Sequence, residues 1–209
     1  MTTHTNETQA NITPENALVF LKEGNQRFQD NLKANRNLLQ QANETSEGQF
    51  PFAVVLSCID SRVSAELIFD QGLGDIFSVR IAGNFVNEDI LGSMEFACKL
   101  SFSKLIVVLG HSKCGAIKGA CDDAKLGNLT ALISKLKPAV NAVKEPAENR
   151  NSSNDEFVEN VARKNVELTI ENIKNQSPVL KDMLDNGKIG MVGGMYNVQS
   201  GEVQFYDIS

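Results

Sequence analysis

The chain has 209 residues, of which 42% are hydrophobic and 22% are charged, with a net charge of −6 and a sequence pI near 5.0. This composition is ordinary for a globular protein and argues against a nucleic-acid-binding face, which needs clustered positive charge. No run approaches the roughly 18 consecutive apolar residues that span a bilayer.

The compartment is predicted from the polar amino-terminal residues and from the cysteines. The first residues contain neither a basic segment nor an apolar one, so no secretory signal is visible. Four cysteines in a chain of this length suit a reduced setting, because a sizeable core needs no disulfides. We therefore expect a cytoplasmic protein, or a periplasmic one if a signal peptide has been removed.

The first predicted element is an amphipathic helix. Thr13 and Pro14 form a typical helix start, and apolar residues then recur with a 3.6-residue period as far as Leu32. A polar stretch separates this helix from the rest of the chain. The helix is therefore expected to pack either on its own domain or on a second subunit.

The remainder of the chain alternates apolar runs of strand length with segments of helical spacing. This alternation predicts an α/β fold with a mainly parallel sheet and helices on both of its faces. Strands are expected at 52–56, 76–81, 104–109, 188–195 and 202–206, helices at 64–70, 89–100, 115–124, 128–137 and 155–175, and a long loop at 138–154.

Two of the predicted strands end in residues that bind soft metals. The first delivers Cys58, and the strand at 104–109 delivers His111 and Cys114. Parallel strands end at the same edge of a sheet, where ligands bind in open α/β folds. Zinc prefers thiolate and imidazole, and a catalytic zinc has three protein ligands and one open position. We therefore expect these three residues to hold one zinc ion, with His111 as the one imidazole available.

An acidic and a basic residue follow the first cysteine. Asp60 is placed to reach the metal or its bound water, and Arg62 can clamp that carboxylate through a bidentate fork. The plainer interpretation is an exposed ion pair of little energetic value. Their position beside the predicted metal ligands favours a functional pair.

Other motifs fit less well. The segment from Gly72 to Phe77 lacks the third glycine of a dinucleotide fingerprint, and Gly110–Gly115 is not followed by the Lys and Ser/Thr of a phosphate-binding loop. The sequence contains no nucleophile elbow, and its other histidine, His4, lies in the polar tail, so no second histidine is available for a catalytic triad. Cys98 and Cys121 lie in helical patterns and are expected to be buried.

The paired motifs resemble those of the β-class carbonic anhydrases. These motifs are Cys58-Ile-Asp60-Ser-Arg62 and His111-Ser-Lys-Cys114-Gly115, with Arg80-Ile-Ala-Gly-Asn84 and Gly92-Ser-Met-Glu-Phe96 between them. The resemblance covers roughly residues 15–207. It implies a zinc enzyme that converts CO2 and water into bicarbonate and a proton through hydroxide on the zinc. It also implies about four parallel strands with a further C-terminal strand, and dimers or tetramers in which amino-terminal helices wrap the neighbouring subunit.

The resemblance also assigns roles to individual residues. It makes Cys58, His111 and Cys114 the zinc ligands and Asp60 with Arg62 a gating pair, in which a released Asp60 takes the fourth metal position in an inactive state. It suggests substrate contacts for Gln49, Phe77 and Phe96, the two phenylalanines across a dimer interface. The chain then divides into a disordered polar tail at 1–13, a helical arm at 14–48 and a zinc-binding catalytic domain at 49–209.

Two other functions remain open from the sequence. Some relatives on this scaffold hydrolyse carbonyl sulfide or carbon disulfide, and the motifs do not separate these substrates from CO2. A non-catalytic zinc-binding or thiol-redox module would need a closed fourth position or a reactive cysteine pair. The sequence offers instead an Asp–Arg pair and no Cys-x-x-Cys motif. No nucleic acid or membrane is expected as a partner.

Overall fold

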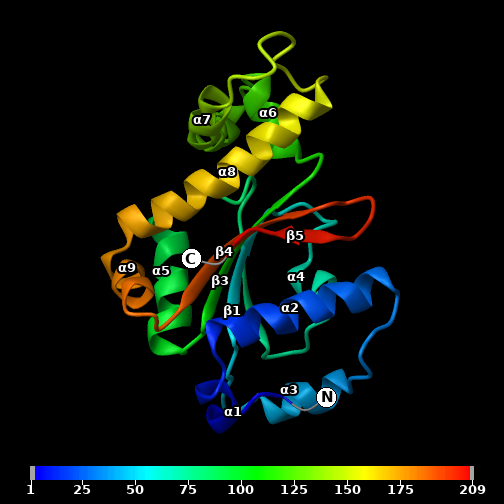
Figure 1. The fold of residues 1–209 in the computed structure, drawn as a ribbon, viewed down its shortest axis with the longest axis vertical. Coiled ribbons are helices and arrows are strands. Elements are labelled where there is room, and N and C mark those ends of the chain that lie inside the picture. The colour runs from blue at the N-terminus through cyan, green and yellow to red at the C-terminus, as the bar shows by residue number, and fades with distance from the viewer. Residues whose placement is uncertain (1–2, 208–209) are drawn as a thin grey trace.

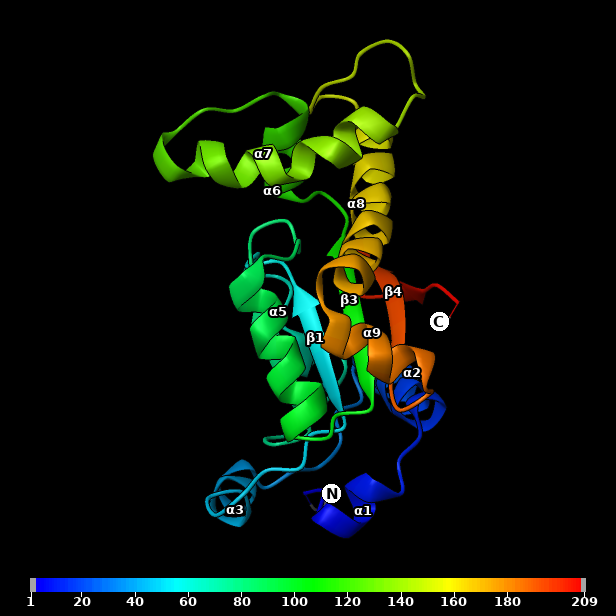
Figure 2. The same cartoon turned by 90° about the vertical axis from the view of Figure 1, so that its left-hand side faces the viewer.

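The computed structural model describes residues 3–207 and is built around one five-stranded sheet (Figures 1 and 2). The strand order is β2-β1-β3-β4-β5; the first four strands are parallel, and β5 is antiparallel to β4. The strands are β1 (Ala53–Ser57), β2 (Ile76–Arg80), β3 (Leu105–His111), β4 (Gly190–Tyr196) and β5 (Val203–Phe205). This arrangement confirms the predicted fold class.

Helices cover both faces of the sheet and extend beyond its ends. They are α1 (Asn6–Ala10), α2 (Pro14–Gln29), α3 (Leu38–Glu44), α4 (Ala65–Ile68), α5 (Glu88–Glu95), α6 (Gly115–Cys121), α7 (Gly127–Ala142), α8 (Asp155–Gln176) and α9 (Pro178–Asp185), with a π-helix η1 (Phe96–Leu100) after α5. Figure 1 shows α5, α8 and α9 on one side of the sheet and α2 and α4 on the other. None of the helices described between residues 3 and 207 is long and apolar enough to cross a membrane.

The central strands carry apolar side chains on both faces, and the two faces form separate cores. Val54, Leu56 and Val108 point into the core beneath α5, α7 and α8, whereas Val55 and Val107 point towards α2 and α4. Strands buried on both sides read as continuous apolar runs, which explains why β1 and β3 were predictable. The sheet therefore provides a rigid base for the residues at its carboxyl edge.

Helix α2 begins as predicted and packs on its own domain. The Thr13 side chain accepts a hydrogen bond from the Asn16 backbone N–H, and Pro14 is the first helical residue. Leu18 and Leu21 are buried against the sheet, which decides between the two packing alternatives. The helix ends at Gln29, three residues earlier than the periodicity suggested.

The residues before α2 include a short helix where the structure describes them, in a segment that was expected to be a disordered polar tail. Thr5 caps α1 in a capping box with Thr8. Gln9 is 2% exposed, and its side chain donates to the carbonyl oxygens of Pro51 and Ser101, both at 2.8 Å. A glutamine that reaches two distant backbone carbonyls leaves no periodic signal in the sequence.

Helix α7 is longer than predicted, because it continues through Pro138 to Ala142. A proline inside a helix loses one backbone hydrogen bond and normally breaks it. Here Leu136, Ala139 and Val140 keep the buried face continuous across the proline, and their packing outweighs that loss. The loop predicted at 138–154 is therefore confined to 143–154, and the short helix α9 was not predicted.

The helix predicted at 89–100 consists of two parts. Asn87 caps α5 by accepting from the Ile90 N–H, and the chain then widens into the π-helix η1. A π-turn places one extra residue in the helix and rotates the side chains that follow. Phe96, the first residue of η1, is half exposed, and its ring centroid lies 6.2 Å from that of Phe77 on β2.

Candidate metal centre

The carboxyl ends of two neighbouring strands bring the predicted metal ligands together. β1 and β3 pair in parallel, with Ser57 opposite Leu109, so Cys58 follows β1 at the level where β3 reaches its last residue, His111. Cys114 then stands at the start of α6. The topology thus gathers side chains that are more than fifty positions apart in the sequence.

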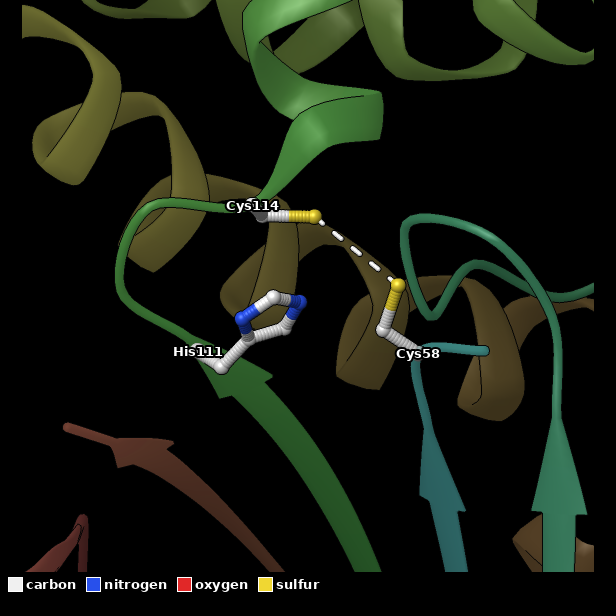
Figure 3. A group of neighbouring side chains, drawn as sticks. All are labelled: Cys58, His111 and Cys114. Atoms are coloured by element: carbon white, nitrogen blue, oxygen red, sulfur yellow. Dashed lines mark hydrogen bonds between the residues drawn. The ribbon is translucent and has the colours of Figure 1, made fainter. Parts of the chain in front are cut away.

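These three side chains form a compact, buried group (Figure 3). The sulfur atoms and an imidazole nitrogen all lie within 4.8 Å of one another, and the two sulfurs are 3.9 Å apart. Cys58, His111 and Cys114 are 3%, 1% and 1% exposed. Two thiols and an imidazole converging in a buried pocket form a donor set that fits a metal ion.

The orientation of the imidazole supports this fit. His111 Nδ1 lies 2.9 Å from the carbonyl oxygen of Ser112, a pure acceptor, so Nδ1 carries the proton. His111 Nε2 therefore has a free lone pair, and it has no hydrogen-bond partner among the described residues although it is buried. A buried, unsatisfied acceptor is costly unless something binds it, and a metal ion would satisfy it.

The two thiols titrate as a pair. A hydrogen bond from the Cys114 thiol stabilises the Cys58 thiolate, which lowers the pKa of Cys58 and raises that of Cys114. The Gly83 backbone N–H, 3.4 Å from the Cys58 sulfur, also favours the thiolate. One thiolate is thus already favoured, and a bound cation would favour ionisation of the second.

Asp60 and Arg62 form the bidentate pair that was predicted. Arg62 Nε lies 2.9 Å from Asp60 Oδ1 and Arg62 Nη2 lies 2.8 Å from Asp60 Oδ2, while the Arg62 backbone N–H also donates to Oδ1. The hydrogen bond from the Arg62 side chain is the main reason why the pKa of Asp60 is far below its ordinary value. Asp60 Oδ2 is 4.0 Å from His111 Nε2, so the carboxylate lies at the edge of the metal-ligand group.

Arg80, the last residue of β2, supports the backbone of the segment that carries Cys58 and Asp60. Its Nε donates to the carbonyl oxygen of Cys58 at 3.0 Å, and its Nη2 donates to that of Asp60 at 2.7 Å. The sequence singled out the segment 80–84 as a motif but did not predict these contacts of Arg80 with the backbone. In the structure this side chain fixes the backbone that carries both a metal ligand and the acidic residue.

The three predicted substrate contacts lie apart from the metal-ligand group of the same chain. Gln49 is exposed in the segment before β1, at the opposite end of that strand from Cys58, and five residues of strand span about 16 Å. Phe77 and Phe96 line an open hollow of about 790 Å³ beside β2, together with Arg80. Within one chain, the structure does not bring Gln49 to the metal-ligand group.

Comparisons with known proteins agree on one family. A family model described as carbonic anhydrase matches residues 53–203. Carbonic anhydrase 2 of Mycobacterium tuberculosis is 33% identical and covers 94% of this chain and 95% of its own length. The carbonic anhydrase of Mycolicibacterium smegmatis is 34% identical, with 93% and 94% covered.

Solved structures give the same result at the level of the fold. The β-carbonic anhydrase CcaA superposes with a TM-score of 0.73 at 26% identity and covers 91% of this chain and 87% of its own. The β-carbonic anhydrase CafA of Aspergillus fumigatus gives 0.70 at 27% identity, covering 92% and 90%. Together with the Cys–His–Cys group at the carboxyl edge of the sheet, these matches show that the chain belongs to the β-class carbonic anhydrase family.

Proposed function

We propose that this protein is a zinc enzyme that catalyses the reversible hydration of CO2 to bicarbonate and a proton. The observation that carries the proposal is the position of Asp60, whose Oδ2 lies 4.0 Å from the unpartnered His111 Nε2. A purely structural metal site has four protein ligands, whereas this one offers three and an acidic side chain at its edge.

The geometry of the donors supports zinc as the metal. Two Zn–S bonds of 2.3 Å at a tetrahedral angle place the sulfurs about 3.8 Å apart, and the observed separation is 3.9 Å. Two thiolates and one imidazole are a ligand set that suits zinc better than magnesium or calcium, which prefer oxygen. When bound, zinc supplies a Lewis acid that makes water a nucleophile near neutral pH.

In this proposal, the residues of the chain orient the reaction. Asp60 is ionised at neutral pH, and the hydrogen bond from Arg62 lowers its pKa further, so the carboxylate can only accept hydrogen bonds. By accepting the O–H of the attacking water, it directs the oxygen lone pair towards the carbon of CO2. Arg62 keeps the carboxylate in that position, and Arg80 holds the backbone beneath it.

The proton released in the reaction must leave to the solvent. His111 belongs to the metal-ligand group, and His4 packs against Phe52 near the amino end of β1, at the opposite edge of the sheet. Neither histidine is therefore placed as a proton shuttle. We expect turnover to depend strongly on buffer concentration.

A stopped-flow assay tests the proposed activity. Purified protein should hydrate CO2, lose that activity when a chelator removes the metal, and regain it when Zn²⁺ is restored. A parallel assay for sulfide release from carbonyl sulfide and carbon disulfide should give much lower rates. Absent CO2 hydration in protein that contains stoichiometric zinc, or a faster sulfide release, would contradict the proposal.

We also propose that the protein works as a homo-oligomer joined along β2. β2 is an edge strand, and the hollow beside it is lined by Phe77 and by Phe96, which is 51% exposed. A second copy on this face would cover the two rings and could bring its own Gln49 into the site. The helical arm at 14–48, whose Leu38 and Leu39 are 56% and 83% exposed, offers further apolar surface for such contacts.

A charge on this face is expected to weaken the assembly. Phe96→Asp would bury a carboxylate in the proposed interface, so light scattering on a sizing column should show a smaller mass than for the wild-type protein. Leu126→Asp is the control, because Leu126 is 72% exposed and lies on the segment before α7. A wild-type mass of one chain, or a Phe96→Asp mass equal to that of an oligomeric wild type, would contradict the interface.

A reduced compartment such as the cytoplasm is proposed from the free cysteines alone.

A further inference from the structure

The turn between β2 and α5 makes an unusual backbone contact with a metal ligand. Its Gly83 N–H points at the Cys58 sulfur, 3.4 Å away. Gly83 and Asn84 both have positive φ angles, of 80° and 41°. A side chain other than glycine rarely adopts this conformation, so the Asn84 conformation needs support from its surroundings.

That support comes from α8, far along the sequence. Asn165 and Thr169 lie one helical turn apart on its inward face and are 4% and 2% exposed. Asn165 Nδ2 donates to the carbonyl oxygen of Gly83 at 2.8 Å, and Thr169 Oγ1 donates to that of Asn84 at 3.3 Å. Buried polar side chains destabilise a helix face unless they are hydrogen-bonded, and these two are bonded to the turn.

The helix α8 also contacts the strand that carries the ligand His111. Gly110, which precedes His111, lies so close to α8 that a Cβ atom there would be 2.6 Å from Val166 Cγ2. Val166 is the neighbour of Asn165 in the sequence. α8 therefore packs against the turn that donates to the Cys58 sulfur and against the strand that carries His111.

We propose that Asn165 and Thr169 are positioning residues of the metal centre, which hold the turn so that the Gly83 N–H donates to the Cys58 sulfur. The Asn165 amide fixes the peptide that follows Gly83, and thereby limits rotation of the peptide that carries the N–H. A hydrogen bond to a thiolate stabilises its charge and restricts its rotamer, so the sulfur is presented to the metal in one position. The inference rests on the proposed metal site but not on the reaction performed there.

Two substitutions remove these hydrogen bonds while keeping the branching of the side chain. Asn165→Leu leaves the buried carbonyl of Gly83 without a donor, and the turn can then rotate the N–H away from Cys58. Outer-shell substitutions typically weaken metal binding by about 10- to 100-fold, which is the loss expected here. Thr169→Val removes one longer hydrogen bond and should weaken binding about 2- to 10-fold. Zn²⁺ affinity is measured by competition with a chromophoric chelator.

A control on the same helix separates positioning from stability. Ile173→Ala removes a fully buried apolar side chain from α8 and should lower the melting temperature at least as much as Asn165→Leu. We expect its Zn²⁺ affinity to stay at the wild-type value. A purely structural role for Asn165 would instead make metal affinity follow melting temperature in all three variants.

The Co²⁺-substituted protein gives a second readout. Loss of the N–H hydrogen bond makes the Cys58 thiolate a stronger electron donor, so its charge-transfer band in the near ultraviolet should move to longer wavelength in Asn165→Leu and stay in place in Ile173→Ala. The proposal is overturned if Asn165→Leu keeps the wild-type Zn²⁺ affinity and the wild-type band, or if Ile173→Ala changes both equally. These measurements need no turnover, so they stand apart from the CO2 assay.

Discussion

Replacing Cys58 or Cys114 with serine is expected to abolish stoichiometric metal binding and, with it, CO2 hydration. A serine hydroxyl is far less acidic than a thiol, so it stays neutral and does not replace the thiolate. The site is then left with two of its three ligands. Loss of an outer-shell partner typically weakens metal binding by about 10- to 100-fold, and loss of a direct thiolate ligand should weaken it by more than that. Turnover should fall by about a thousandfold or more, because the metal's stabilisation of the transition state is lost.

The two remaining cysteines provide matched controls for this experiment. Among the described residues, neither Cys98 nor Cys121 belongs to the Cys–His–Cys group, so neither thiol is placed to bind the same metal ion. Cys121→Ser, at a half-buried position, should keep one metal ion per chain by elemental analysis. Full metal content in Cys58→Ser or Cys114→Ser would contradict the proposed ligand set.

Substitution of the Asp–Arg pair should separate metal binding from catalysis. Asp60→Asn and Arg62→Ala are expected to retain the metal, because neither residue belongs to the Cys–His–Cys group. The value of kcat/KM should fall by about 10²- to 10³-fold, the range for the loss of a positioned acid–base or electrostatic group. The double variant should be little worse than either single variant, because the two side chains act as one unit.

The direction of the Asp60 pKa shift determines the pH range in which the Asp60–Arg62 pair is formed. The pKa of Asp60 is lowered chiefly by the Arg62 hydrogen bond, so the stabilising pair is fully formed above the ordinary pKa of about 3.9 and is lost only as the pH falls through the lowered value. Even without Arg62, Asp60 remains ionised at neutral pH. The ratio of Asp60→Asn to wild-type activity should therefore stay constant between about pH 6 and pH 9.

An exposed ion pair elsewhere is the control for the pair. Glu167 Oε2 and Lys164 Nζ are 2.8 Å apart on the surface of α8, and Glu167→Gln should leave turnover unchanged. Full activity in Asp60→Asn would show that the pair is a surface feature without a catalytic role. Loss of metal in Asp60→Asn would show that the carboxylate belongs to the metal-binding group itself.

The metal-ligand group could be predicted because each half is local in the sequence. Each apolar run predicts a strand, and the metal-binding residues follow it directly in the sequence. Parallel strands then place their carboxyl ends at one edge of the sheet. The Asp–Arg pair was predictable for the same reason, since Asp60 and Arg62 are two residues apart. The amide of Gly83 and the side chains of Asn165 and Thr169 had no such signal, because a lone buried polar residue in a helix has no characteristic spacing.

The sequence by itself determined the parallel sheet, the start of α2 and the three metal-binding side chains, since strand burial, helix capping and ligand chemistry all act over a few neighbouring residues. Tertiary structure alone decided that Gln9 orders α1, that α7 passes through Pro138, and that α8 supports the Cys58 sulfur through a turn. Those outcomes depend on hydrogen bonds and packing between segments far apart in the chain. Such contacts exist only once the fold has brought the two partners together.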